Sequence, residues 1–164
     1  MAIWYRGADV VVDADPLLAA FPGATGDVAV FVHGLVENDR SWWWSARTYY
    51  GDADVSYGTR LRDDLGITPV DLRYTTGLPV AANGRRLDEL LAALVDAWPV
   101  PVERLSLVGH SMGGLLIRGA CHRGAAERRP WVGLVRRAVY LGIPHHGAPL
   151  SASSALRCVS TRCR

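Results

Sequence analysis

Residues 105–118 read Leu-Ser-Leu-Val-Gly-His-Ser-Met-Gly-Gly-Leu-Leu-Ile-Arg, an apolar run that leads without a linker into a glycine-rich turn and then into a helical pattern. This order predicts a buried strand, a tight turn and a helix, with Ser111 on the turn. A serine hydroxyl is a weak nucleophile, and a sharp turn between strand and helix exposes it to a base. Ser111 is therefore the candidate catalytic nucleophile.

The glycines around Ser111 fit this interpretation. Gly109 and Gly113 lie two positions to either side of it, where side chains would collide as strand and helix close together, and Gly114 widens the clearance. The helix that begins at the turn also directs free N–H groups and the positive end of its dipole toward a developing oxyanion. In a chain with 17 glycines, a chance Gly-x-Ser-x-Gly match is the alternative.

A second apolar run, residues 28–32, is mostly β-branched or aromatic, which is typical of a strand buried on both faces. His33-Gly34-Leu35 ends it. Glycine at position 34 allows the backbone to bend and to approach a substrate oxygen without a Cβ in the way. An ordinary turn at the end of a strand is the alternative, and His33 itself is expected to be structural.

Three motifs together carry a family resemblance. Residues 30–35 (Val-Phe-Val-His-Gly-Leu), 109–114 (Gly-His-Ser-Met-Gly-Gly) and 141–147 (Leu-Gly-Ile-Pro-His-His-Gly) resemble the α/β-hydrolase superfamily and, within it, the branch of lipases and serine esterases. The similarity spans about residues 27–149. It implies a three-layer α/β fold, a mainly parallel sheet with helices on both faces, and the C-terminal strands of such a domain are expected to be missing.

The resemblance also implies an oxyanion hole and a site around it. The two donors would be the backbone N–H groups of the residue after His-Gly and of the residue after the nucleophile, which are Leu35 and Met112 here. The supporting turns and the possible rim of the site comprise His33, Gly34, Gly109, His110, Gly113, Gly114, Trp42, His145 and His146.

The rest of the chain alternates between strand and helix patterns, which independently favours a mainly parallel sheet. An edge strand is expected at 10–12, a short helix at 16–21, a helix capped by Asp39 or Ser41 that carries three tryptophans, a helix over Tyr57–Leu65 with Gly66 as C-cap, and strands at 70–74 and 135–141. The clearest helix has Leu87, Leu90, Leu91, Leu94, Val95 and Trp98 on its apolar face, Asn83 as N-cap, and Arg85, Arg86, Asp88, Glu89 and Asp96 on other faces.

This organisation predicts a lead-in at residues 1–26, a partial α/β-hydrolase domain at 27–150 and an atypical, disordered tail at 151–164. The tail loses the apolar period and is dominated by serine and arginine, which resembles the product of a frameshift or a truncated gene, and a genuine disordered tail is the alternative.

The expected catalytic triad is incomplete. In this superfamily the acid and then the histidine follow the serine in the chain. His110 should point away from its neighbour Ser111, and His122 lies about 16 Å along the helix. His145 and His146 would lie at the correct rim of the sheet, although in the family this loop shapes the pocket. Since Glu127 is the single carboxylate side chain after Ser111, loss of the triad acid and histidine is expected to impair activity.

Composition narrows the functional classes. A net charge of +2 gives no reason to expect a nucleic-acid partner. Neither a secretory signal nor an apolar run of about 18 residues is present, so no transmembrane segment is expected. Cys121, Cys158 and Cys163 suggest free thiols and a cytoplasmic protein. The cysteines and histidines lack metal-type spacing, and Gly-rich nucleotide motifs are missing, so neither metal nor cofactor is expected.

The sequence therefore predicts a serine hydrolase of the esterase or lipase type that cleaves a small-molecule or lipid-like carboxylic ester through an acyl-enzyme on Ser111. An acyltransferase or thioesterase on the same scaffold is an alternative, because these enzymes differ in the acceptor that resolves the acyl-enzyme. A non-catalytic fragment that acts as a binding module is the other alternative.

Overall fold

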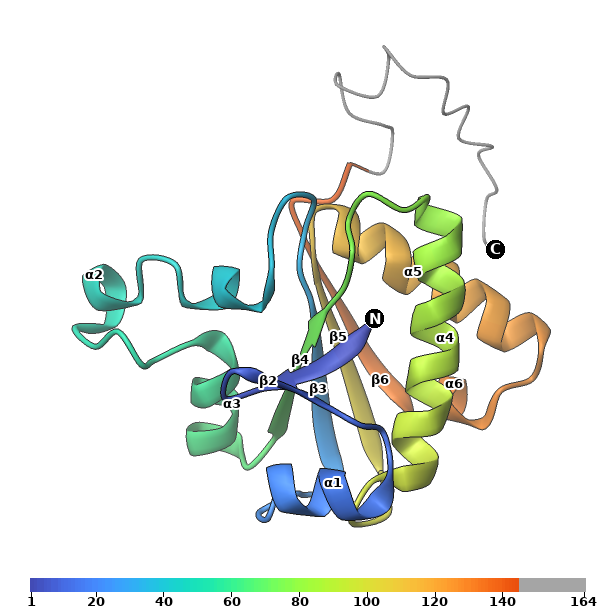
Figure 1. Cartoon of the computed structure of the whole chain (residues 1–164), viewed down its shortest axis with the longest axis horizontal. Helices are drawn as coiled ribbons and strands as arrows, with labels where there is room; N and C mark the ends of the chain where they lie inside the picture. The colour runs from blue at the N-terminus through green and yellow to red at the C-terminus, as the bar shows by residue number, and fades with distance from the viewer. Residues whose placement is uncertain (145–164) are drawn as a thin grey trace.

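A computed structural model describes residues 1–144 of the chain, and in it six strands form one sheet in the order β2-β1-β4-β3-β5-β6 (Figure 1). The predictions for His145, His146 and the tail lie outside the described residues. The strands are β1 (Ala2–Tyr5), β2 (Ala8–Val10), β3 (Asp27–Val32), β4 (Thr68–Arg73), β5 (Arg104–His110) and β6 (Val135–Leu141).

Strands β4, β3, β5 and β6 are parallel, while β1 runs antiparallel to both β4 and β2. The register pairs Val32 at the end of β3 with Gly109 near the end of β5. Because carboxyl ends of parallel strands meet at one edge of a sheet, the residues after β3 lie beside those after β5. The predicted three-layer, mainly parallel α/β-hydrolase-type fold is confirmed.

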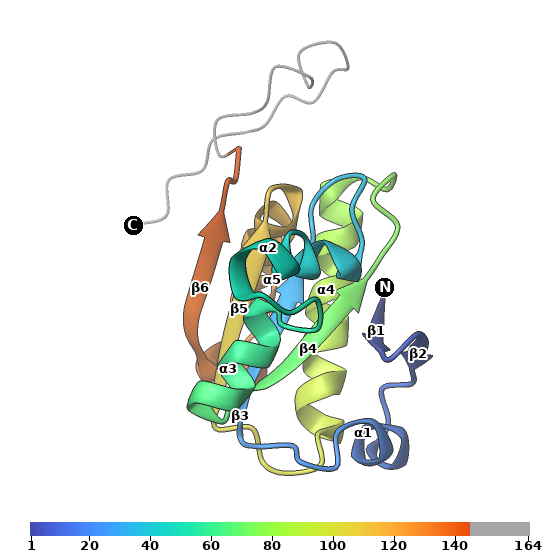
Figure 2. The same cartoon turned by 90° about the vertical axis from the view of Figure 1, so that its left-hand side faces the viewer.

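Helices cover both faces of the sheet (Figures 1 and 2). On one face lie α4 (Val80–Ala97), α5 (Met112–Ala126) and α6 (Pro130–Leu134), and on the other lie the 3-10 helix η1 (Asp39–Trp43), α2 (Ala46–Tyr50) and α3 (Tyr57–Leu65). The larger core lies under α4 and α5, and a smaller one, Ala29, Phe31, Val108 and Trp42, lies under η1 and α3. Helix α3 and its C-cap Gly66, at φ 67°, are as the sequence predicted.

Two predicted helix caps are wrong. Helix α4 begins at Val80, so Asn83 lies in its first turn, where the buried side-chain amide donates a 2.9 Å hydrogen bond to Thr75 O. At η1 the cap is Asn38, whose Oδ1 accepts a 2.9 Å bond from the N–H of Arg40. In both cases the loop before the helix is shorter than the residue pattern indicated.

The lead-in, residues 1–26, adds strands β1 and β2 and the helix α1 (Ala14–Ala20) to the structure. Ile3 of β1 and Leu17 of α1 are fully buried in the larger core. The second strand ends at Val10, so the edge strand lies two residues earlier than predicted, and α1 begins at Ala14 with Asp13 as its cap. These residues therefore form one edge of the sheet, next to β4.

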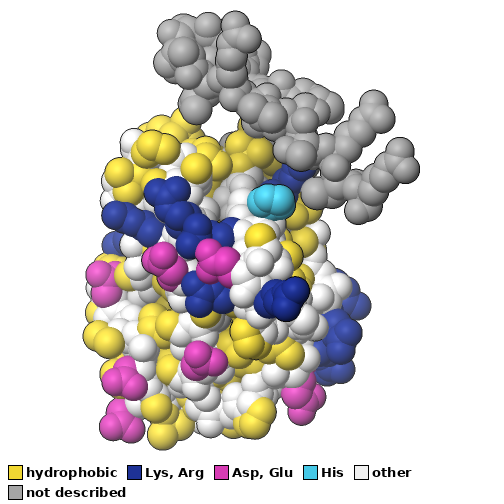
Figure 3. All heavy atoms as spheres, turned by 90° about the vertical axis from the view of Figure 1, so that its right-hand side faces the viewer, with side chains coloured by type: hydrophobic (Ala, Val, Ile, Leu, Met, Phe, Trp, Pro, Cys, Tyr) yellow, Lys and Arg dark blue, Asp and Glu magenta, His cyan; other side chains and the backbone are white. Residues whose placement is uncertain are grey.

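The outer surface of the helical layer formed by α4, α5 and α6 carries arginine and acidic side chains side by side (Figure 3). Glu127 pairs there with Arg123 at 2.6 Å and with Arg129 at 2.9 Å. No helix in the described part of the chain combines the length and the apolar character that crossing a bilayer requires.

Candidate active site

Ser111 occupies the sharp turn between β5, which ends at His110, and α5, which begins at Met112. Its backbone has φ 49° and ψ −120°, a strained conformation for a residue with a side chain. The N–H of Ser111 donates a 2.8 Å hydrogen bond to Leu141 O at the end of β6, which holds the turn against the neighbouring strand. This is the backbone geometry that exposes a nucleophilic hydroxyl above the sheet.

The three glycines of the turn have no room for a side chain. A Cβ at Gly113 would lie 2.1 Å from Val32 O on β3, and one at Gly109 would lie 2.7 Å from the Cα of Gly114. At Gly114 it would lie 1.5 Å from the Cδ1 of Ile143. Gly113 thus lets α5 approach the end of β3, Gly109 lets β5 approach α5, and Gly114 makes room for Ile143 after β6.

The loop that follows β3, residues 33–37, leaves one backbone donor unused. Gly34 N–H donates to Glu37 Oε2 at 2.7 Å, Val36 N–H to Thr76 Oγ1 at 3.4 Å, and Glu37 N–H to Gly34 O at 3.4 Å. Within residues 1–144, the N–H of Leu35 has no hydrogen-bond partner. Leu35 is an exposed residue, and no described group of the protein competes for this N–H, so it can donate to a ligand.

Met112 provides a second free donor. As the first residue of α5, it has no carbonyl one turn earlier to bond to, and its N–H has no partner in the part of the chain that the structure describes. The two backbone donors that the family resemblance implied, Leu35 and Met112, are thus both unoccupied.

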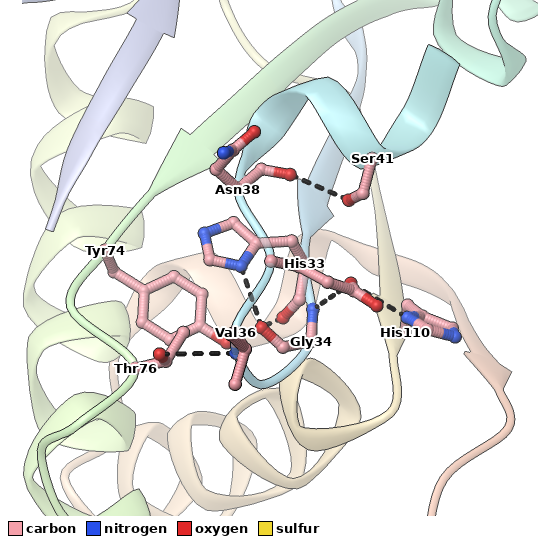
Figure 4. A network of polar contacts seen from close by, with 9 residues as sticks. His33, Gly34, Val36, Asn38, Ser41, Tyr74, Thr76 and His110 are labelled. Carbon is pink, nitrogen blue, oxygen red and sulfur yellow. Dashed lines mark hydrogen bonds and ion pairs between the residues drawn. The ribbon is translucent and has the colours of Figure 1, made fainter. Parts of the chain in front are cut away.

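One carboxylate links the two turns. In Figure 4 the dashed lines from the labelled residues Gly34 and His110 meet at one of its oxygens, which is Oε2 of Glu37. Besides the Gly34 N–H, Glu37 Oε2 accepts a 2.9 Å hydrogen bond from Nδ1–H of His110, the residue directly before Ser111. A Cβ at Gly34 would lie 2.9 Å from that oxygen and 3.1 Å from His110 Nδ1. The space at Gly34 is therefore filled by this pair, which is a different reason for glycine than the close approach of a substrate oxygen.

His33 has a structural environment. It is fully buried, its Nδ1–H donates to Gly34 O at 3.0 Å, and its ring stacks on Tyr74 with centroids 4.2 Å apart. Tyr74 in turn donates a 2.6 Å bond from its hydroxyl to His33 O. Burial lowers the pKa of His33 and raises the pKa of Tyr74, so both side chains are neutral near pH 7.

Other residues named from the sequence have neighbours or partners outside the Ser111 turn. Trp42 is 7% exposed and packs edge-on against Phe31 at 5.1 Å. His122 is exposed on α5, and Glu127 is occupied by its two arginines. An open hollow of about 480 Å³ is lined by residues of the N-terminal strands, by Asn38, and by Arg73 and Tyr74 at the end of β4. Ser111 is not among the residues that line it.

Sequence reasoning missed Glu37, because no local pattern relates it to a histidine 73 residues later. The spacing of three residues between Gly34 and Glu37 would have indicated a turn, but not the contact with His110. Among residues 1–144, no group of three histidine, cysteine or acidic side chains is arranged to hold a metal ion.

Comparison with protein-family models matches residues 25–139 to the family described as "Putative serine esterase (DUF676)". Among solved structures, the fold is similar to that of the lipase BlEst2 from Bacillus licheniformis in its mature form, with 24% identity and a TM-score of 0.56. The match covers 78% of this chain and 46% of that one, so the chain spans a little under half the length of the lipase. No curated protein matches the chain.

Proposed function

Because the chain belongs to the DUF676 serine esterase family, we propose that it is a hydrolase that cleaves a carboxylic ester through an acyl-enzyme on Ser111. The observation that carries this proposal is the arrangement around Ser111. A serine at φ 49° stands on the strand-to-helix turn, and the unpartnered N–H groups of Leu35 and Met112 belong to the two adjoining turns.

The chemistry follows from these groups. Oγ of Ser111 attacks the ester carbonyl carbon, its proton passes to a base, and the carbonyl electron pair moves onto the oxygen to give a tetrahedral oxyanion. The N–H groups of Leu35 and Met112 donate to that oxygen, and removal of one such donor typically costs about 10²–10³ in rate. Collapse of the intermediate breaks the C–O bond to the alcohol oxygen, which takes the proton from the base and leaves as the alcohol. Water then attacks the acyl carbon, which releases the acid and returns a proton to Oγ of Ser111.

The histidines that the structure describes are all engaged elsewhere or distant. His33 is buried and neutral, His110 is bound to Glu37, and His122 is exposed ten residues beyond the start of α5. We therefore expect this chain to turn over esters slowly, with a residual acceleration of ~10³–10⁴ over water from the oxyanion hole and binding. His145 and His146 lie outside the described residues and stay candidates for the base.

The substrate is proposed to be a small-molecule or lipid-like ester, and the cytoplasmic location stays a prediction. An acyltransferase or thioesterase would share the acyl-Ser111 step and differ in the acceptor or the leaving group. A binding module would keep the fold and leave Ser111 unreactive, so reactivity of Ser111 separates it from the enzymes.

The test is covalent labelling of the full chain with a fluorophosphonate probe, followed by intact mass measurement and peptide mapping, together with hydrolysis of a p-nitrophenyl ester. One label is expected on Ser111, and Ser111→Ala is expected to abolish both signals with little change in stability. Ser45→Ala is the matched control, because Ser45 is also a serine with positive φ, at 59°, and is exposed. Labelling that persists in Ser111→Ala overturns the proposal.

A further inference from the structure

Glu37 connects the loop that carries Leu35 to the turn that carries Ser111. Its side chain is only 11% exposed, and the single oxygen Oε2 accepts both the N–H of Gly34, at 2.7 Å, and Nδ1–H of His110, at 2.9 Å. Gly34 follows β3 and His110 ends β5. The same oxygen of Glu37 is therefore hydrogen-bonded to residues at the C-terminal ends of two neighbouring parallel strands, β3 and β5.

We infer that Glu37 is a positioning residue of the esterase site, which fixes the Leu35 N–H relative to the Met112 N–H so that both donate to one oxyanion. This inference rests on the proposed function of Ser111 and adds a residue to which neither the sequence pattern nor the family match gave a role.

The placement of the two donors explains why such a restraint matters. Leu35 directly follows the residue whose N–H Glu37 holds, and Met112 follows His110 by two positions. Oxyanion donors act at about 2.7–3.1 Å from the developing charge, and a misplacement of about 1 Å can cost about 10²-fold in rate. The position of the loop must therefore be fixed to a fraction of an ångström.

The sheet alone does not provide this precision. The pairing of β3 with β5 ends at Val32 and Gly109, so the loop after β3 lies beyond the ladder. Within that loop Val36 is 88% exposed at φ 60°, and its N–H bond to Thr76 is long, at 3.4 Å. The two bonds to the Glu37 carboxylate are the short ones, and carboxylate bonds are stronger than neutral ones.

The bond to His110 distinguishes this role from simple closure of a turn. A carboxylate that only closed the turn would need the Gly34 N–H and nothing else. Here the same oxygen also accepts a hydrogen bond from His110, which lies 73 residues later in the chain and directly precedes Ser111. The absent Cβ of Gly34 lets Glu37 and His110 pack against its Cα, so the three residues form one unit.

Substitutions at position 37 separate positioning from charge. Glutamine keeps the shape of the side chain and one carbonyl oxygen that can accept both bonds, but it carries no charge. Alanine removes both bonds. If Glu37 acts through hydrogen-bonded geometry, Glu37→Gln is expected to behave nearly as the native protein does, and Glu37→Ala is expected to be slow.

The experiment measures phosphonylation of Ser111 in the full chain over a range of fluorophosphonate concentrations. Glu37→Ala is expected to lower the maximal rate by ~10–100-fold with the half-saturating probe concentration unchanged, and Glu37→Gln to stay within about 3-fold of the native rate. Glu127→Ala is the matched control, because it removes a carboxylate with two partners at the far end of α5. Its labelling rate is expected to be unchanged.

Thermal unfolding of each variant shows whether it is folded. If Glu37→Ala fails to fold, Glu37→Asp, which is one methylene shorter, is measured in its place and is expected to lose at least about 10-fold. A native rate in the folded Ala or Asp variant overturns the inference and leaves the function of Ser111 standing, as does an equal loss in the Gln and Ala variants. A native chain that is not labelled at Ser111 overturns the proposed function and the inference with it.

Discussion

The indole N–H of Trp131 donates a 2.9 Å hydrogen bond to Oδ1 of Asp88, and both side chains are buried, with Asp88 fully so. The bond joins α6 to α4. Arg123 and Arg129 bring their guanidinium groups to 3.3 and 3.7 Å from the other carboxylate oxygen. Asp88, which the helical pattern placed on a polar face, is therefore the buried centre of contacts among α4, α5 and α6.

Asp88→Ala is expected to lower the free energy of unfolding by about 3 kcal/mol, because it leaves the buried indole N–H of Trp131 without its acceptor and removes one of the two carboxylates beside Arg123 and Arg129. Asp88→Asn keeps an acceptor for Trp131 and should cost less. Urea unfolding checks both, with Asp96→Ala, an exposed aspartate on the same helix, as control. Equal losses for Asp88→Ala and Asp96→Ala would contradict the assigned role.

Gly113→Ala is expected to destabilise the fold by about 2–4 kcal/mol, since the new Cβ would meet Val32 O at 2.1 Å and must push α5 away from β3. Gly119→Ala in the same helix is the control. Its Cβ would have nothing closer than Gly84 Cα at 3.9 Å, so a gain of up to about 1 kcal/mol from helix propensity is expected. Thermal unfolding of the pair measures the difference, and a Gly113→Ala protein as stable as the native one would refute the close approach.

Gly34→Val is expected to slow fluorophosphonate labelling of Ser111 by ~10²–10³, the cost of losing one oxyanion donor. Its Cβ would lie 2.9 Å from Glu37 Oε2 and would force the loop to move, and the N–H of Leu35 would move with it. Gly77→Ala, in the loop after β4 with nothing within 4 Å of its Cβ, should label at the native rate. Unchanged labelling of Gly34→Val would mean that the loop only ends a strand.

Stability is expected to depend on pH through Asp71. Burial, and then the charge of Asp39, raises its pKa to about 7 from the ordinary value of 3.8. The folded protein thus keeps this proton when the unfolded chain has lost it, so the contribution of Asp71 to the free energy of unfolding falls as pH rises from about 4 to about 7 and is then constant.

Asp71→Asn removes this penalty. It is expected to raise the free energy of unfolding by about 1–3 kcal/mol near pH 8 and to change it little near pH 4. Urea unfolding at the two pH values checks the difference, with the exposed Asp54→Asn as control. A gain of equal size at both pH values would show that the substitution acts through packing and not through titration.

Local sequence determined the central elements of the molecule. The strands β3, β5 and β6, the helix α3 with its cap, and the Ser111 turn were all predictable, because each depends on residues within a few positions of one another. Continuous apolar runs indicate buried parallel strands, and glycine on both sides of a serine permits one tight turn between strand and helix. The family resemblance pointed to Leu35 and Met112 from the same short motifs.

The tertiary structure decided what depends on partners far along the chain. In the sequence, Glu37 and Asp88 are carboxylates with no identifiable partner. Only the fold brings His110 to Glu37 and Trp131 to Asp88, and these hydrogen bonds give the two carboxylates their structural roles. Helical periodicity sorts residues by polarity, and it cannot show that an aspartate faces a neighbouring helix that supplies its hydrogen-bond donors. The proposed oxyanion donors, Leu35 and Met112, show the same division. Their positions in the chain follow from sequence motifs. Whether their N–H groups are free depends on every other hydrogen bond of the two turns.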